Sequence, residues 1–152
     1  MARDTTNSTP LETREQLLDA LAGGCKPKED WRIGTEHEKF GFYKADFSPV
    51  PYEGDVGIKA LLEGMQAKTG WEPLMDAGNI IGLAASDGMG AISLEPGGQF
   101  ELSGAPLKTI HETCRESNRH LADAREVAEP LGMGFLGLGG SPKWTFADTP
   151  QM

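Results

Sequence analysis

The sequence is poor in cysteine and has no long hydrophobic run. Its two cysteines, Cys25 and Cys114, are more typical of reduced thiols than of a disulfide-stabilised secreted domain. No stretch approaches the roughly 20 apolar residues that span a bilayer, and residues 1–10 contain no apolar segment of a secretory signal. From these absences we expect a cytoplasmic protein without membrane contact.

Positive charge is also scarce. The chain has 14 basic and 23 acidic residues, which gives a formal net charge of -9. Such a charge repels the phosphate backbone of nucleic acid and an anionic membrane surface. With 152 residues, 38% of them hydrophobic, the composition is that of one globular domain, and nucleic acid is excluded as an expected partner.

Helical patterns begin and end at capping residues. Thr9, Pro10 and Glu12 form the pattern of a capping box, which predicts a first helix that ends at the glycines 23–24. A second helix is expected over residues 55–70. The longest helix is expected to begin at Pro106. Apolar residues at spacings of three, four and seven predict the face that it turns inward: Leu107, Ile110, Cys114, Leu121 and Ala128.

Apolar runs on both sides of the turn-forming sequence SDGM predict a β-hairpin over residues 79–95. The sequence PGG at residues 96–98 indicates a bulge or a bend after it. A short strand is expected where the sequence reads GFLGLGG. The resulting order α-β-α-β-β-α-β favours an α+β fold over a doubly wound parallel sheet.

Two predicted strands carry carboxylates on one face. In RIGTEHEKFGFY, residues 32–43, alternation places Glu36 and Glu38 on the side of Phe40 and Phe42. On the second strand, one side contains Glu95, Gln99 and Glu101, and the other contains Ile92, Leu94, Phe100 and Leu102.

Carboxylates that share a space repel one another unless a cation neutralises them. Oxygen ligands on strands suit a hard cation, and Mg²⁺ is usually held by a few carboxylates together with substrate phosphates. In this interpretation Phe40 and Phe42 form the dry floor of a metal site. The alternative is that the glutamates lie on the solvated face of an edge strand, which is the common place for Glu.

The remaining candidate residues favour structural roles. His37 falls on the face opposite to the glutamates and is expected at the surface or beside a ligand. His111 and His120 are expected as surface or helix-end residues, because no partner lies at a metal-binding spacing. The glycine run at residues 137–140 lacks the ending of a phosphate-binding loop and is expected to form a turn.

Several motifs occur in a specific order. IGTEHEKFGF is followed by ISLEPGGQFELSGAPLKTIHETC and then by GFLGLG and PKW. This pattern, from about residue 30 to residue 145, resembles the plant and proteobacterial type of glutamate-cysteine ligase, also called γ-glutamylcysteine synthetase.

The resemblance implies a curved, mostly antiparallel sheet with packed helices, part of the carboxylate-amine ligase fold shared with glutamine synthetase. It also implies a reaction in which ATP phosphorylates the γ-carboxylate of glutamate and the amine of cysteine displaces phosphate. The products are γ-glutamylcysteine, ADP and phosphate, and this is the first step of glutathione synthesis. Mg²⁺ and ATP are the cofactor and co-substrate that the resemblance implies.

The resemblance also assigns roles to residues of this sequence. Glu36, Glu38, Glu95 and Glu101 match the positions of metal ligands, and Gln99 and Ser103 match the substrate side of the site. The catalytic basic residues of the family are expected beyond position 152. We therefore expect residues 1–152 to be the N-terminal portion of a single catalytic domain that is incomplete at its C-terminus.

Two further functions remain as alternatives. One is an ATP-dependent carboxylate-amine ligase that uses a different amine. The other is a non-catalytic fragment that binds metal or a partner. An incomplete sheet exposes an edge and apolar side chains, so we also expect the chain to self-associate, and its activity alone stays open.

Overall fold

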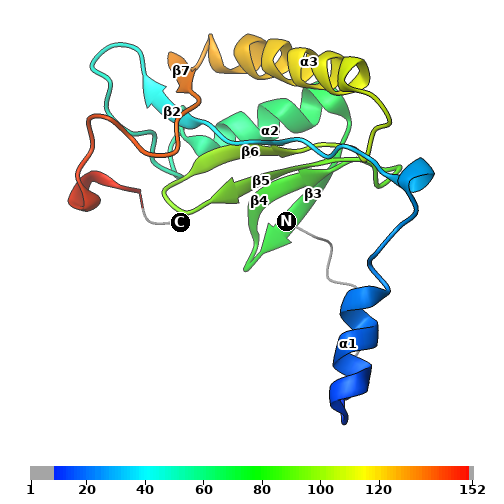
Figure 1. Cartoon of the computed structure of the whole chain (residues 1–152). Helices are drawn as coiled ribbons and strands as arrows, with labels where there is room; N and C mark the ends of the chain where they lie inside the picture. Colours follow the sequence, from blue (N-terminus) through cyan, green and yellow to red (C-terminus); the bar gives the residue numbers. More distant parts are fainter. Residues whose placement is uncertain (1–8, 151–152) are drawn as a thin grey trace.

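The computed structural model describes residues 9–150, and this part of the chain is an α+β fold (Figure 1). The helices are α1 Arg14–Ala22, α2 Ile58–Thr69 and α3 Ile110–Ala128, with 3₁₀ helices at Lys28–Asp30 and Phe146–Asp148. The strands are β1 Glu36–His37, β2 Phe40–Tyr43, β3 Glu72–Asp76, β4 Asn79–Ala84, β5 Ala91–Glu95, β6 Gln99–Ser103 and β7 Met133–Leu136.

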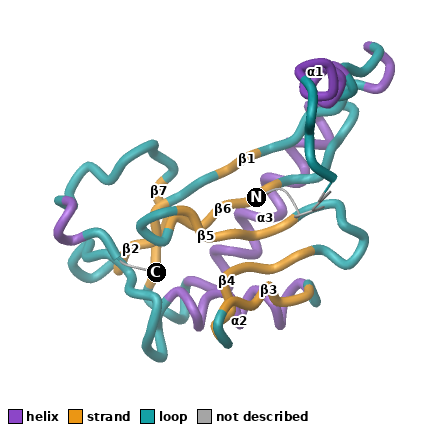
Figure 2. Tube along the Cα trace, turned by 90° about the horizontal axis from the view of Figure 1, so that it is seen from below, coloured by secondary structure: helices purple, strands orange, loops and turns teal. Residues whose placement is uncertain are grey.

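A five-stranded antiparallel sheet organises the fold, with the strand order β1-β6-β5-β4-β3. Helices α2 and α3 lie on one face of this sheet, above it in Figure 1. Figure 2 looks onto the opposite face, which no helix of residues 9–150 covers. The predicted α+β class, the antiparallel sheet and the hairpin of β4 and β5 are confirmed, and the sheet stays open, with β1 and β3 at its edges.

The core lies between this sheet and the two helices. Alternate side chains of the central strands point toward the helices, because successive residues of a strand face opposite sides. The buried residues that fill the core include Leu83, Ile92, Phe100 and Leu102 from the strands and Ile58, Leu61, Leu62 and Met65 from α2. The predicted inward face of α2 is therefore confirmed. Gly70 ends α2 in the left-handed conformation, at φ 70°.

Helix α3 differs from the prediction in its start and its inward face. Thr109 caps it and forms a capping box with Glu112, so the helix begins after Pro106 and Leu107. Its buried residues are His120, Ala124 and Ala128, spaced by four, so the prediction is confirmed for Ala128, whereas Ile110 and Cys114 are exposed. Small alanines face inward because α3 packs closely against α2.

Helix α1 also begins later than predicted. Thr13, not Thr9, is its N-cap, and Gln16 completes the capping box. Figure 1 shows α1 projecting away from the sheet. Its apolar side chains Leu17, Leu18 and Leu21 are exposed by 50%, 51% and 71%. The predicted apolar stripe therefore exists, but it does not pack on the sheet.

The strand predicted over residues 32–43 is divided in two. Strand β1 pairs with β6 in the main sheet, and β2 pairs with β7 in a separate two-stranded sheet. Glu38 and Lys39 lie at the break. This division places Glu36 in the main sheet and Phe40 and Phe42 in the two-stranded sheet, with Glu38 between them.

Candidate functional site

The hairpin of β5 and β6 positions the first acidic pair. Ser93 pairs with Glu101 and Glu95 pairs with Gln99, so these side chains share the face away from α2 and α3. The intervening residues 96–98 make the tight turn between the strands, with φ of 80° at Gly97 and 74° at Gly98. The predicted bulge or bend is therefore a hairpin turn, and the predicted parity of the strand is confirmed.

Strand β1 brings the second acidic pair to the same sheet. Glu36 pairs with Ser103 and His37 pairs with Leu102. The N–H of Phe100 donates to the carbonyl of Lys39 over 2.8 Å, which continues this register past the end of β1. Glu38 therefore comes opposite Glu101, and the charge of Glu38 acts on Glu95. The structure brings Glu38, Glu95 and Glu101 together.

Glu101 is the most deeply placed of these carboxylates, with 3% of its surface exposed. The Ser93 hydroxyl donates to its Oε2 over 2.7 Å, and the Ser103 hydroxyl donates to its Oε1 over 3.1 Å. Burial raises the pKa of Glu101, but hydrogen bonds with Ser93, Ser103 and Glu95 lower it, and the pKa lies below its usual value. Glu101 is therefore a buried carboxylate that stays ionised.

The pKa of Glu95 is shifted in the opposite direction. Burial raises the pKa of its carboxyl, and a hydrogen bond with Glu101 and the charges of Glu101 and Glu38 raise it further. Glu95 therefore holds a proton more readily than an ordinary glutamate. A cation placed between the two carboxyls would take the place of that proton.

Glu36 and Glu38 are exposed at the edge of the sheet. Together with His37 and the glycine-rich segment Gly137, Leu138 and Gly139 they line an open pocket of about 320 Å³. His37 is half-buried and points to the face opposite to the glutamates, as predicted from alternation. The glycine run therefore borders Glu36 and Glu38.

Of the predicted substrate-side residues, Ser103 donates to Glu101, and Gln99 lies half-buried opposite Glu95 at the end of the hairpin. Within the described residues, the Oε1 atom of Gln99 is buried without a hydrogen-bond partner. A buried amide oxygen without a partner is costly and suits a position that a ligand completes.

The donor set matches a hard cation, but it does not enclose one. Residues 9–150 contain no group of three or more His, Cys, Asp or Glu side chains arranged to hold a metal ion. Mg²⁺ keeps several waters and is usually bound through one or two carboxylates and substrate phosphates. Glu95 and Glu101 fit that partial mode of binding, in which the protein supplies only part of the coordination.

Phe40 and Phe42 do not form the floor beneath the glutamates. With Phe47, Leu136 and Trp144 they line a separate apolar pocket of about 300 Å³ beside β2 and β7. The rings of Phe40 and Trp144 meet edge to face with centroids 5.5 Å apart. The prediction of a shared floor is wrong because the strand breaks after Glu38 and β2 joins another sheet.

Sequence reasoning missed two residues beside the carboxylates. Ser93 lies opposite Glu101 in the hairpin, and strand pairing alone reveals this contact. Lys39 is only 1% exposed, and burial lowers its pKa to about 8 although the charge of Glu101 acts to raise it. The signal for Lys39 was its parity, which places it on the helix side of the strand beside His37.

His120 was expected near the surface and is instead 6% exposed, stacked on Phe100 at 5.8 Å between ring centroids. Burial lowers its pKa to about 3, and the charges of Lys39 and His37 lower it as well. Its imidazole is therefore neutral at physiological pH, and it belongs to the core rather than to a helix end.

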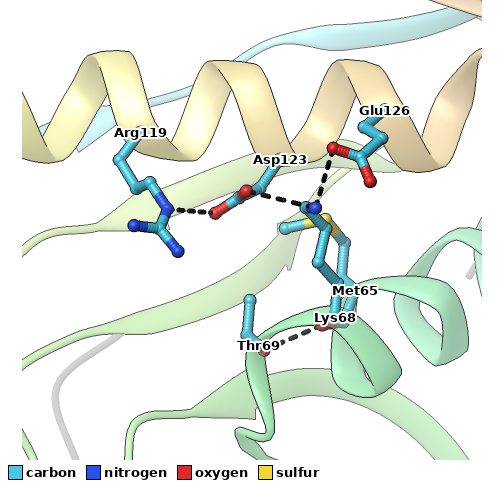
Figure 3. A network of polar contacts seen from close by, with 6 residues as sticks. All are labelled: Met65, Lys68, Thr69, Arg119, Asp123 and Glu126. Atoms are coloured by element: carbon cyan, nitrogen blue, oxygen red, sulfur yellow. Dashed lines mark hydrogen bonds and ion pairs between the residues drawn. The ribbon is translucent and has the colours of Figure 1, made fainter.

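The face that carries the helices has a polar network of its own (Figure 3). Lys68 of α2 lies 3.6 Å from Asp123 and 2.8 Å from Glu126 of α3, and Arg119 lies 3.1 Å from Asp123. The two ion pairs of Lys68 join α2 to α3, whereas the pair of Arg119 and Asp123 lies within α3. They fix the helix pair and are separated from the carboxylates by the sheet.

Comparison with known proteins identifies clear relatives. The profile of a family described as Glutamate-cysteine ligase family 2 (GCS2) matches residues 32–152. A chloroplastic glutamate-cysteine ligase of Medicago truncatula is 52% identical over 149 residues, which cover 98% of this chain and 28% of the relative. The chloroplastic enzymes of Nicotiana tabacum and Arabidopsis thaliana are 55% and 53% identical over 140 residues, which cover 92% of this chain and 26% of each relative.

The names of these relatives correct one expectation. All three are described as chloroplastic, which contradicts the cytoplasmic location expected from the composition and points to the plastid. Among residues 9–150, no helix combines the length and apolar character needed to cross a membrane. The chain spans little more than a quarter of the length of the relatives that it matches.

Proposed function

Because the chain belongs to glutamate-cysteine ligase family 2, we propose that it takes part in the ATP-dependent ligation of glutamate to cysteine. In this reaction the γ-carboxylate of glutamate is joined to the amine of cysteine, giving γ-glutamylcysteine, ADP and phosphate. This is the first step of glutathione synthesis. We further propose that these residues form one part of a single catalytic domain, since the chain spans 28% of the Medicago truncatula relative.

The observation that supports this proposal most strongly is the carboxylate face of β5 and β6. Glu101 is buried and accepts hydrogen bonds from Ser93 and Ser103, which lower its pKa, whereas burial and the neighbouring carboxylates raise the pKa of Glu95. Two neighbouring carboxyls on one face of the sheet, with pKa values shifted in opposite directions, provide oxygen ligands for a cation. Glu38 adds a third negative charge to the same space.

The proposed metal ligands are Glu36, Glu38, Glu95 and Glu101, and the proposed cation is Mg²⁺. When bound, Mg²⁺ would neutralise the charge on ATP phosphates during phosphoryl transfer. The chain supplies negative charge from two strands and leaves coordination positions for water and phosphate. Gln99 and Ser103, at opposite ends of β6, are proposed to border the substrate.

Two alternatives give different outcomes. A ligase of the same family that joins another amine would retain ATP and Mg²⁺ dependence and would prefer an amine other than cysteine. A non-catalytic metal-binding domain would bind Mg²⁺ without releasing ADP in the context of a complete enzyme. Substrate profiling separates the first alternative from the proposal, and ADP release separates the second.

Location in the plastid is proposed from the names of the relatives. Import of the protein into isolated chloroplasts tests it, and a protein that stays outside the organelle would contradict it.

The test of activity uses a chimera. Residues 9–150 replace the matching segment of the Medicago truncatula ligase, to which the chain is 52% identical. We expect Mg²⁺-dependent ADP release that requires glutamate and rises with cysteine. Glu101→Gln in the chimera should lower turnover and raise the Mg²⁺ requirement, because it removes a negative ligand and keeps the shape of the side chain.

The matched control is Glu72→Gln, an exposed position on the edge strand β3 of the same sheet. It removes the same charge from the same sheet and should leave turnover unchanged. A folded chimera that lacks ADP release, or a Glu101→Gln variant with wild-type turnover, would contradict the proposed function.

A further inference from the structure

Lys39 occupies an unusual place at the end of β1. In an antiparallel ladder, every second pair of opposing residues exchanges two backbone hydrogen bonds, and Lys39 and Phe100 occupy such a position. Here the Phe100 N–H donates to the Lys39 carbonyl over 2.8 Å, and the Phe100 carbonyl accepts from the Lys39 ammonium over 3.0 Å. The Lys39 side chain thus supplies the second hydrogen bond at the position where the chain leaves the main sheet.

The ammonium group makes two more contacts at the same junction. It donates to the carbonyl of His37 over 3.1 Å and lies 5.2 Å from the ring centroid of Phe100. Lys39 is 1% exposed, so these contacts are made away from water, where a charge-assisted hydrogen bond is strong. One side chain therefore joins His37, the last residue of β1, to Phe100, the second residue of β6.

The carboxylates on the other face of the sheet repel each other, so the pairing of β1 with β6 requires a stabilising contact here. In the register of β1 and β6, Glu38 comes opposite Glu101. Like charges directly opposite each other destabilise a strand pair. The Lys39 ammonium attracts Glu101 from the helix side of the sheet and holds the two strands together at this point.

We propose that Lys39 is a positioning residue of the carboxylate site: it holds β1 against β6 so that Glu38 and Glu101 face the same cation. The inference rests on the proposed function, because it takes the carboxylates to be metal ligands. Lys39 does not bind the cation itself, because its side chain lies on the helix side of the sheet and its ammonium donates to the backbone carbonyls of His37 and Phe100. It acts by fixing the position of the backbone that carries the carboxylates.

The first experiment measures Mn²⁺ binding to the purified chain by electron paramagnetic resonance, with Mn²⁺ as the probe for Mg²⁺. Lys39→Met should weaken binding by about 10-fold or more, the size of effect seen when a partner that orients metal ligands is removed. Lys68→Met is the matched control, because it changes a lysine on α2 that bonds only across the helix pair. Its Mn²⁺ affinity should equal that of the wild type.

Circular dichroism at the temperature of the assay confirms that each variant is folded. Equal Mn²⁺ affinity in folded Lys39→Met and in the wild type would overturn the inference. Lys39→Arg keeps the charge and the donors, so it should recover part of the affinity. An arginine variant that binds as weakly as the methionine variant would show that charge and donors are irrelevant and would also overturn it.

A second experiment needs no metal. If Lys39 opposes the repulsion between Glu38 and Glu101, then Glu38→Gln should restore part of the stability that Lys39→Met removes. The four chains of this double-mutant cycle are compared by urea unfolding. Strictly additive effects would overturn the inference, because a purely structural lysine has no reason to couple to Glu38.

The two experiments separate the inference from the proposed function. If the wild-type chain does not bind Mn²⁺, the proposed metal site is wrong, and the coupling between Lys39 and Glu38 decides the positioning role by itself. If Lys39→Met does not fold, Lys39→Gln, which removes the charge and keeps a hydrogen-bond donor, replaces it in both experiments.

Discussion

The two faces of the central sheet are made by the same strands and have opposite chemistry. On β6, Phe100 points to the helices and is 0% exposed, while its neighbour Glu101 points to the other face and is 3% exposed. Both side chains are buried, so burial does not distinguish them. The difference is that Phe100 packs against apolar side chains, whereas Glu101 accepts hydrogen bonds from Ser93 and Ser103.

Adjacent residues of β6 therefore have different roles: Phe100 contributes to stability, and Glu101 contributes to the proposed cation site. The helix face gains free energy by removing apolar area from water. The carboxylate face keeps negative charge in a position where it is desolvated, which is unfavourable unless hydrogen bonds or a cation compensate it. Variants on one face should therefore change unfolding, and variants on the other should change cation binding.

The largest effect is expected from Phe100→Ala. Removal of a fully buried ring should lower the free energy of unfolding by about 3 to 5 kcal/mol. Urea unfolding of the chain measures it. Phe42→Ala, which shortens a half-buried ring at the edge of the aromatic pocket, should cost clearly less. Equal losses would show that the helix face is not the core.

Glu101→Gln is expected to change cation binding more than stability. Its affinity for Mn²⁺ should fall by at least about 10-fold, because even groups that only orient metal ligands contribute that much. The amide keeps an acceptor for a serine hydroxyl, so the unfolding free energy should fall by less than in Phe100→Ala. Calorimetric titration and urea unfolding measure the two quantities, and a stability loss without a change in affinity would contradict the separation of the faces.

The stability of the helix face should depend on pH because of the buried His120. Its folded-state pKa is lowered from 6.5 to about 3, so below pH 6.5 the unfolded chain binds a proton that the folded chain does not. The free energy of unfolding should therefore decrease as the pH falls from 6.5 to 3, by up to about 1.4 kcal/mol per pH unit from this group. His120→Gln should flatten that part of the profile, which chemical unfolding at several pH values will reveal. Parallel profiles for the two chains would show that His120 is not buried as a neutral group.

The smallest effect on stability is expected on α1. Leu18 is 51% exposed, so Leu18→Gln should change the unfolding free energy by less than about 0.5 kcal/mol. The same substitution reduces the exposed apolar stripe of α1 and should lower self-association, which light scattering measures. A large loss of stability would show that α1 packs on the sheet.

The sequence was sufficient for features that depend on local patterns. Alternation placed Glu95 and Glu101 on one side of their strands, and the inward face of α2 followed from the spacing of its apolar residues. The turn sequence SDGM correctly predicted the hairpin of β4 and β5. Each of these features arises from residues close together in the chain.

Features that arise from distant contacts were not predicted. The break after Glu38 depends on pairing with β6 and β7, which lie far along the chain, so Phe40 and Phe42 were placed in the wrong sheet. The inward face of α3 depends on close packing against α2, where small alanines are favoured over the larger Ile110. Ser93 beside Glu101 required the register of the hairpin.

The measurement that tests the central claim most directly is Mn²⁺-induced broadening of amide signals in the ¹⁵N NMR spectrum of this chain. We predict selective broadening of β1 and of the hairpin of β5 and β6, reversed by excess Mg²⁺ and absent in Glu101→Gln. Broadening confined to other acidic segments, such as the surroundings of Asp87, or no broadening at all, would contradict a cation site on the carboxylate face.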